Sequence, residues 1–85
     1  KNVQAAAILA RLPGELIELK LAVRHKWVGR AIKDLKIPDG VIIVAVLRAC
    51  QIKTATGDLE LAAGDRVVVF CLPAAVDRMA PLFTA

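Results

Sequence analysis

The spacing of hydrophobic and polar positions changes several times along this chain and divides it into short elements. In residues 16–23 the apolar side chains alternate with mixed positions, as in a strand that buries one face. Residues 28–36 carry apolar side chains at helical spacing, which predicts a short helix that Pro38 ends. Seven consecutive apolar residues, 41–47, then predict a strand that is buried on both faces.

Shorter apolar segments at 52–54 and 66–72 predict further strands, 59–61 predicts a brief extended piece, and a helix is expected over 74–82 behind Pro73. The order is therefore βαβββα, a small α+β domain with a mixed sheet. We expect its first two strands to form a parallel crossover and both helices to lie on one face. An Ala-rich helix at 3–11 is expected as a linker or docking helix, so that 1–12 precedes a domain over 13–85.

The second face of this sheet has no obvious cover within the chain. Two short helices can cover one face, yet 41–47 and 67–72 are apolar on both faces. The cover could be the leading helix, another domain of a longer protein, or a second copy of the chain. Large exposed apolar patches usually mark interfaces, and two-fold dimers are the commonest assembly, so we predict a homodimer.

Composition narrows the class of protein. The 85 residues have room for one domain, with 58% hydrophobic residues and a mean hydropathy of +0.60. The longest apolar run is seven residues, against the roughly 20 that span a bilayer. Together with the missing signal-peptide layout and initial Met, this predicts a cytoplasmic domain cut from a longer chain.

Few side chains in this sequence could carry catalysis or bind a metal ion. There is no Ser and no GxGxxG motif, and Cys50 and Cys71 are expected as buried small hydrophobes. His25 is expected to be exposed, with no ligand nearby, and Trp27 to anchor its segment on the core. A cation site from Asp58, Glu60 and Asp65 is an alternative, but their spacing is not that of a calcium loop. We predict no enzyme, no catalytic residue and no metal site.

The net charge of +4 comes entirely from the first half of the chain. Residues 1–40 hold eight Lys and Arg against four Asp and Glu, whereas 41–85 hold four of each. A solvated basic face is the favoured interpretation, and no nucleic acid is expected. The alternative is a binder of nucleic acid or of an anionic surface that uses Arg24, Lys26, Arg30, Lys33 and Lys36.

The order of motifs resembles one known family over about residues 14–83. A Val-Gly-x-x-Ile-x-x-Leu segment precedes an Ile-Pro-x-Gly turn, an apolar strand that ends in Arg, and a Leu-x-x-Gly-Asp hairpin. This order is similar to that of the C-terminal regulatory domain of Trk and RCK potassium transport proteins (TrkA-C, RCK-C). The matching positions are Val28, Gly29, Ile32, Leu35, Ile37, Pro38, Gly40, Arg48, Leu61, Gly64 and Asp65.

The resemblance implies a cytosolic module of a potassium or other cation channel or transporter. Such domains dimerise and bind a small regulatory ligand, a nucleotide or a cation, at or near the dimer interface; no other cofactor is expected. The candidate contacts are Ile37, Pro38, Val41, Ile42 and Ile43, and the motif positions with a structural role are Gly29, Gly40, Arg48, Gly64 and Asp65.

Some relatives bind a cyclic dinucleotide through Arg and Asn side chains at the Ile-Pro-x-Gly turn. Residues 37–43 contain neither Arg nor Asn, so a ligand there would rely on backbone groups and apolar contact. A purely structural assembly module without a ligand is the remaining alternative.

Overall fold

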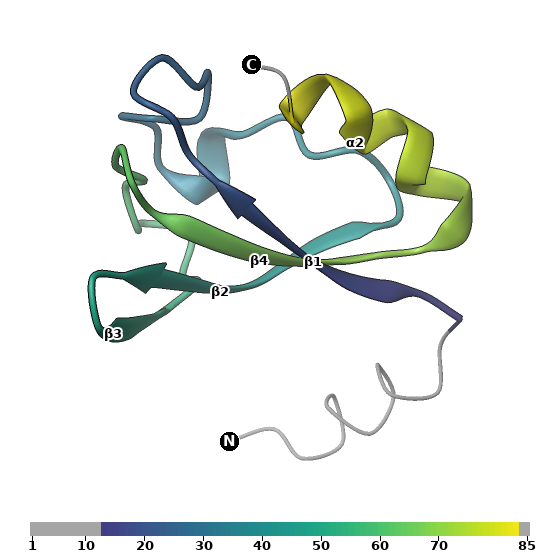
Figure 1. Cartoon of the computed structure of the whole chain (residues 1–85), viewed down its shortest axis with the longest axis horizontal. Helices are drawn as coiled ribbons and strands as arrows, with labels where there is room; N and C mark the ends of the chain where they lie inside the picture. The colour runs from purple at the N-terminus through teal and green to yellow at the C-terminus, as the bar shows by residue number, and fades with distance from the viewer. Residues whose placement is uncertain (1–12, 84–85) are drawn as a thin grey trace.

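The computed structural model describes residues 13–83 and is built on a four-stranded antiparallel sheet (Figure 1). Because β4 (Arg66–Cys71) contributes the apolar residues 67–71, it takes an inner position with partners on both sides. The strand order is β1-β4-β2-β3. The strands are β1 (Glu15–Lys20), β2 (Val41–Arg48), β3 (Gln51–Thr54) and β4 (Arg66–Cys71).

The α+β class is confirmed, but the expected pairing of the first two strands as parallel neighbours is wrong. β1 and β2 both pair antiparallel with β4, so they run in the same direction without being neighbours. The strand inserted between them makes every ladder of the described sheet antiparallel, and the sheet is therefore not mixed. The hydrophobic pattern identified the strands, but the position of β4 depends on contacts between distant segments.

The predicted helix over 28–36 is wrong, because this segment forms only the 3-10 turn η1 (Ile32–Asp34). Its backbone bonds instead to the segment before β4: Gly29 N–H donates to Leu61 O at 2.8 Å, and Ile32 N–H donates to Leu59 O at 3.0 Å. These contacts replace the bonds that an α-helix would make along its own backbone. The brief extended piece expected at 59–61 accordingly forms one isolated bridge, Ala31↔Glu60.

The prediction of two helices on one face is therefore also wrong. In residues 13–83 the only α-helix is α2 (Val76–Phe83), which follows the 3-10 turn η2 (Pro73–Ala75). Figure 1 shows α2 and the long β1–β2 connection on the same side of the sheet. The predicted helix at 3–11 lies outside the described residues.

The core lies between the sheet and this layer of loop and helix. Side chains of β1, β2 and β4 that point to this side meet those of the connection and of α2. The core cluster consists of Leu19, Leu21, Trp27, Val41, Val46, Leu61, Val67, Val69, Cys71, Ala75, Met79 and Leu82. Phe70 is also buried, at 6% exposed, but lies outside this cluster.

Two predictions about exposure are wrong. Cys50 is exposed, because it lies in the tight β2–β3 turn beside Ala49, whose φ is +56°. His25 is only 4% exposed and makes hydrogen bonds across the fold. Cys71 and Trp27, by contrast, are buried as expected. Within the described residues no helix has the length and apolar character needed to cross a membrane.

Candidate functional site

A charged clamp joins the end of β2 to the loop before β4. The Arg48 Nε donates to Asp65 Oδ1 at 2.9 Å, and its Nη2 donates to Asp65 Oδ2 at 2.8 Å and to the Glu60 carbonyl oxygen at 2.8 Å. The Ala62 N–H donates to Asp65 Oδ2 at 2.9 Å. Asp65 is 1% exposed, so this carboxylate is desolvated and held by a paired donor set.

The clamp favours the charged form of both partners. The hydrogen bonds from Arg48 hold the pKa of the Asp65 carboxyl below its usual range, although burial acts in the opposite direction. The hydrogen bond to Asp65 correspondingly raises the pKa of Arg48. Asp65 is therefore occupied as an ion-pair partner. In the described part of the chain, no three His, Cys, Asp or Glu side chains are grouped so that they could hold a metal ion.

The face of the sheet away from α2 carries an apolar row. Leu16 on β1 and Ile42 on β2 both lie opposite Phe70 on β4, so these three residues lie side by side across the sheet. Leu16 is 64% exposed and Ile42 54% exposed, with Val44 on β2 at 41%. Phe70, which lies between Leu16 and Ile42, is only 6% exposed. Exposed aliphatic side chains on either side of a buried aromatic ring form a surface suited to a partner.

The structure divides the five residues that sequence reasoning proposed as ligand or dimer-cleft candidates. Val41 is 8% exposed and belongs to the core, and Ile43 packs against the core from the same side of β2. Ile37 and Pro38 are half-buried in the turn before β2, and Ile42 lies on the opposite sheet face. Ile37, Pro38 and Ile42 therefore retain surface for a ligand or partner.

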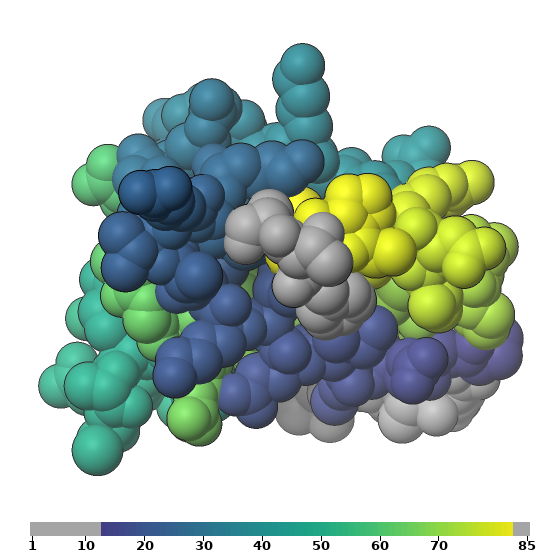
Figure 2. Space-filling view, turned by 45° about the horizontal axis from the view of Figure 1, so that its top comes forward, coloured from purple at the N-terminus to yellow at the C-terminus, as the bar shows by residue number. Residues whose placement is uncertain are grey.

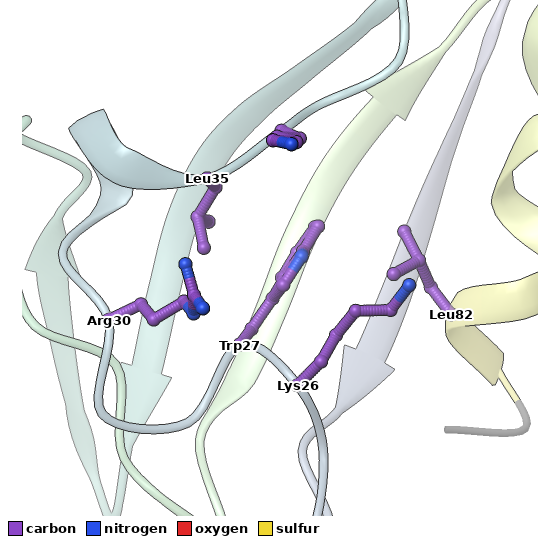
Figure 3. A pocket seen from close by; sticks show the side chains of 6 residues that line it. Lys26, Trp27, Arg30, Leu35 and Leu82 are labelled. Carbon is purple, nitrogen blue, oxygen red and sulfur yellow. The ribbon is translucent and has the colours of Figure 1, made fainter.

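A separate basic cavity of about 320 Å³ lies between the β1–β2 connection and the end of α2. Figure 2 shows this connection (blue) beside α2 (yellow) on one face of the molecule. In Figure 3, Lys26 and Arg30 lie on either side of the Trp27 indole. The lining residues are Lys26, Trp27, Arg30, Leu35, Lys36 and Leu82.

The five basic residues considered for nucleic-acid binding do not all serve this cavity. Lys26, Arg30 and Lys36 line it, whereas Lys33 points elsewhere and pairs with Asp58 at 3.2 Å. Arg24 is exposed and is not a lining residue. The basic groups thus gather around a concave site rather than along a continuous stripe.

His25 holds the two walls of this cavity together, and sequence reasoning missed this role. The Trp27 N–H donates to His25 Nδ1 at 3.1 Å, so Nδ1 is an acceptor and the proton is on Nε2. The Nε2–H then donates to the Leu82 carbonyl oxygen at 2.9 Å. His25 and Leu82 are 57 positions apart in the chain, and no local pattern indicates that they meet.

Comparison with known proteins identifies the family. The TrkA-C domain family matches residues 16–84. The chain belongs to the TrkA-C domain family. It is 34% identical to a Trk system potassium uptake protein TrkA homolog of Archaeoglobus fulgidus, over a stretch that makes up 94% of this chain and 21% of that protein.

A second curated relative agrees. The chain is 30% identical to Trk system potassium uptake protein TrkA homolog 2 of Methanosarcina mazei, over 98% of this chain and 18% of that protein. The chain therefore spans about a fifth of the length of these relatives.

A solved structure shares the fold. It is the RCK C domain of the potassium transport protein KtrA in complex with cyclic diadenosine monophosphate, with a TM-score of 0.70. The match covers 93% of this chain and 92% of that one, and the sequences are 21% identical.

Proposed function

We propose that this domain is the cytosolic regulatory module of a potassium or other cation transport system, and that it dimerises and senses a small ligand. The observation that carries the proposal is the match of residues 16–84 to the TrkA-C domain family. The relatives of similar sequence are Trk system potassium uptake proteins. The membrane-embedded transporter, on the same or an associated chain, is the proposed partner. Within this function the domain itself needs no catalysis.

The apolar row supports dimerisation through the face of the sheet away from α2. Leu16 and Ile42 flank Phe70, and both are more than half exposed. A second copy placed on this face would remove these aliphatic side chains from water, a gain of about 25 cal/mol for each Å² buried. Residues 1–12 are the competing cover that the sequence predicts.

Sedimentation velocity on the full chain tests this interface. The native chain is expected to sediment as a dimer, and Ile42→Lys, which places a charge in the apolar row, is expected to shift it to monomer. Val23→Lys is the matched control, because Val23 is 78% exposed but lies outside the strands. A native chain that stays monomeric at high concentration would exclude the dimer and favour an intramolecular cover.

We further propose that the regulatory ligand contacts Ile37, Pro38 and Ile42 near this interface. The mechanism is a population shift: a ligand that binds one dimer arrangement more tightly than another biases the attached transporter toward that arrangement. A thermal-shift screen with cyclic diadenosine monophosphate, other nucleotides and K⁺ or Na⁺ tests it, because a ligand that prefers the folded state raises the unfolding temperature. No shift with any of them supports a structural assembly module instead.

A further inference from the structure

The basic cavity gathers positive charge without a counter-charge. Lys26, Arg30 and Lys36 line it, and no Asp or Glu does. Within residues 13–83 the ion pairs are Lys33–Asp58, Arg48–Asp65 and Arg66–Glu18, so none of them involves a lining cation. Like charges gathered around one concave site repel one another, and an anion bound among them relieves this repulsion.

The walls of the cavity are fixed before any ligand arrives. The Gly29 N–H donates to the Leu61 carbonyl oxygen at 2.8 Å, and the Leu61 N–H donates to the Arg30 carbonyl oxygen at 2.9 Å, which ties the cationic wall to the segment before β4. His25 ties the same wall to Leu82 at the end of α2. A backbone held in this way loses little conformational freedom when the site binds a ligand.

His25 also improves the electrostatics of the cavity. Carbonyl groups at the end of a helix carry partial negative charge and would repel an anion. The Leu82 carbonyl oxygen is instead occupied by the Nε2–H of His25 at 2.9 Å. The polar lining is therefore dominated by donors, while Trp27, Leu35 and Leu82 provide an apolar part.

We propose that this cavity binds a small organic phosphate. Its phosphate oxygens contact Lys26, Arg30 and Lys36, and its organic part lies against Leu35, Leu82 and the edge of Trp27. A guanidinium is well suited to phosphate because it can donate two parallel hydrogen bonds. The volume of about 320 Å³ is at the small end of the range of roughly 300–1,000 Å³ in which small molecules bind.

A small molecule fits the cavity better than a nucleic acid does. A polynucleotide needs basic groups that follow its backbone, but Lys33 is paired with Asp58 and Arg24 lies outside the cavity. The other three of the five basic residues, Lys26, Arg30 and Lys36, converge on one concave site. This site uses other residues than the proposed dimer face and the turn at 37–38. An experiment can therefore disprove the phosphate site and leave the proposed regulatory function intact, or disprove that function and leave the phosphate site intact.

Trp27 makes the test direct, since the chain contains one Trp and no Tyr. The full chain is titrated with AMP and with ribose 5-phosphate at low salt, and binding is followed by Trp27 fluorescence and by calorimetry. Adenosine and inorganic phosphate serve as separated halves of AMP. The expected result is saturable binding of an organic phosphate at least about tenfold tighter than of either half, and weaker binding at higher salt.

Charge-removing variants locate the site. Arg30→Gln and Lys36→Gln are each expected to weaken binding about tenfold, in line with the loss of one charge-assisted hydrogen bond. Lys20→Gln is the matched control, because Lys20 is exposed on β1 and does not line the cavity. Thermal unfolding of each variant verifies that it folds.

Several results would overturn the proposal. They are no saturable binding of either organic phosphate, binding that Arg30→Gln and Lys36→Gln leave unchanged, and an equal loss in Lys20→Gln. Inorganic phosphate binding as tightly as AMP would remove the role of the apolar wall. A single-stranded oligonucleotide that binds far more tightly than AMP would assign the surface to nucleic acid instead.

Discussion

Arg48 and Asp65 are 17 positions apart, yet the guanidinium binds both carboxylate oxygens, at 2.9 Å from Nε to Oδ1 and 2.8 Å from Nη2 to Oδ2. The Arg48 side chain is 35% exposed and that of Asp65 1%. The contact fixes the end of β2 against the loop that leads into β4. It also gives a structural role to two motif positions, Arg48 and Asp65.

Removing Arg48 is expected to cost about 3 kcal/mol in the free energy of unfolding, because Arg48→Met leaves a desolvated carboxylate with one backbone donor. Arg48→Lys should recover only part of this, since an ammonium cannot donate two parallel hydrogen bonds in the same geometry. Urea unfolding followed by circular dichroism measures both. Glu18→Gln is the control: it breaks an exposed ion pair with Arg66 at 3.3 Å and should cost under about 1 kcal/mol. An equal loss of stability in Arg48→Met and Glu18→Gln would contradict the clamp.

The same pair predicts how stability depends on pH. The pKa of Asp65 is lowered in the folded protein, chiefly by the hydrogen bonds from Arg48, whereas an unfolded Asp titrates near about 3.9. Its contribution is therefore complete above the unfolded pKa and is lost as the pH falls through the lower folded pKa. Native and Asp65→Asn proteins should differ most at neutral pH and converge below about pH 4. A difference in unfolding midpoint between the native and Asp65→Asn proteins that stays constant from neutral pH to about pH 2 would contradict this linkage.

The His25 bridge predicts a loss of stability localised at the basic cavity. His25→Ala leaves the buried Trp27 N–H and the Leu82 carbonyl without their partner, which should cost about 3 kcal/mol, including the space left by the ring. His25→Asn can still accept from the Trp27 N–H and should lose about half as much. Denaturant unfolding followed by Trp27 fluorescence measures the loss of stability in both variants. An alanine variant as stable as the native chain would rule out the bridge.

The turn before β2 predicts an effect that depends on backbone conformation. Gly40 has a φ of +87°, and a Cβ there would lie 3.1 Å from the Ala75 Cβ, so Gly40→Ala should destabilise the fold by about 1–2 kcal/mol. Gly57→Ala is the matched control, because its added Cβ would meet only the Lys33 Cβ at 3.4 Å. It should change stability by less than about 1 kcal/mol. Thermal unfolding compares the two; an equal loss in both would contradict the role of the Gly40 conformation.

Local pattern was sufficient for much of the fold. Alternation in β1, the apolar runs of β2 and β4, and Pro73 ahead of the last helix identified those elements, because each signal depends on neighbours a few residues apart. The order of motifs likewise identified the family. The segment 28–36 shows where this reasoning fails: its spacing is helical, but its backbone groups bond to 57–61 instead.

The sequence by itself determined the α+β class, the main strands, the apolar surplus of the sheet and the excess of positive charge in the first half. Only the tertiary structure decided that β4 lies between β1 and β2, that Arg48 meets Asp65, and that His25 joins Trp27 to Leu82. It also decided which basic residues share a cavity and which one pairs with Asp58. The physical reason is the same in each case: hydrogen bonds and charges act between atoms that are close in space, and periodicity along a chain does not record which distant segments become neighbours.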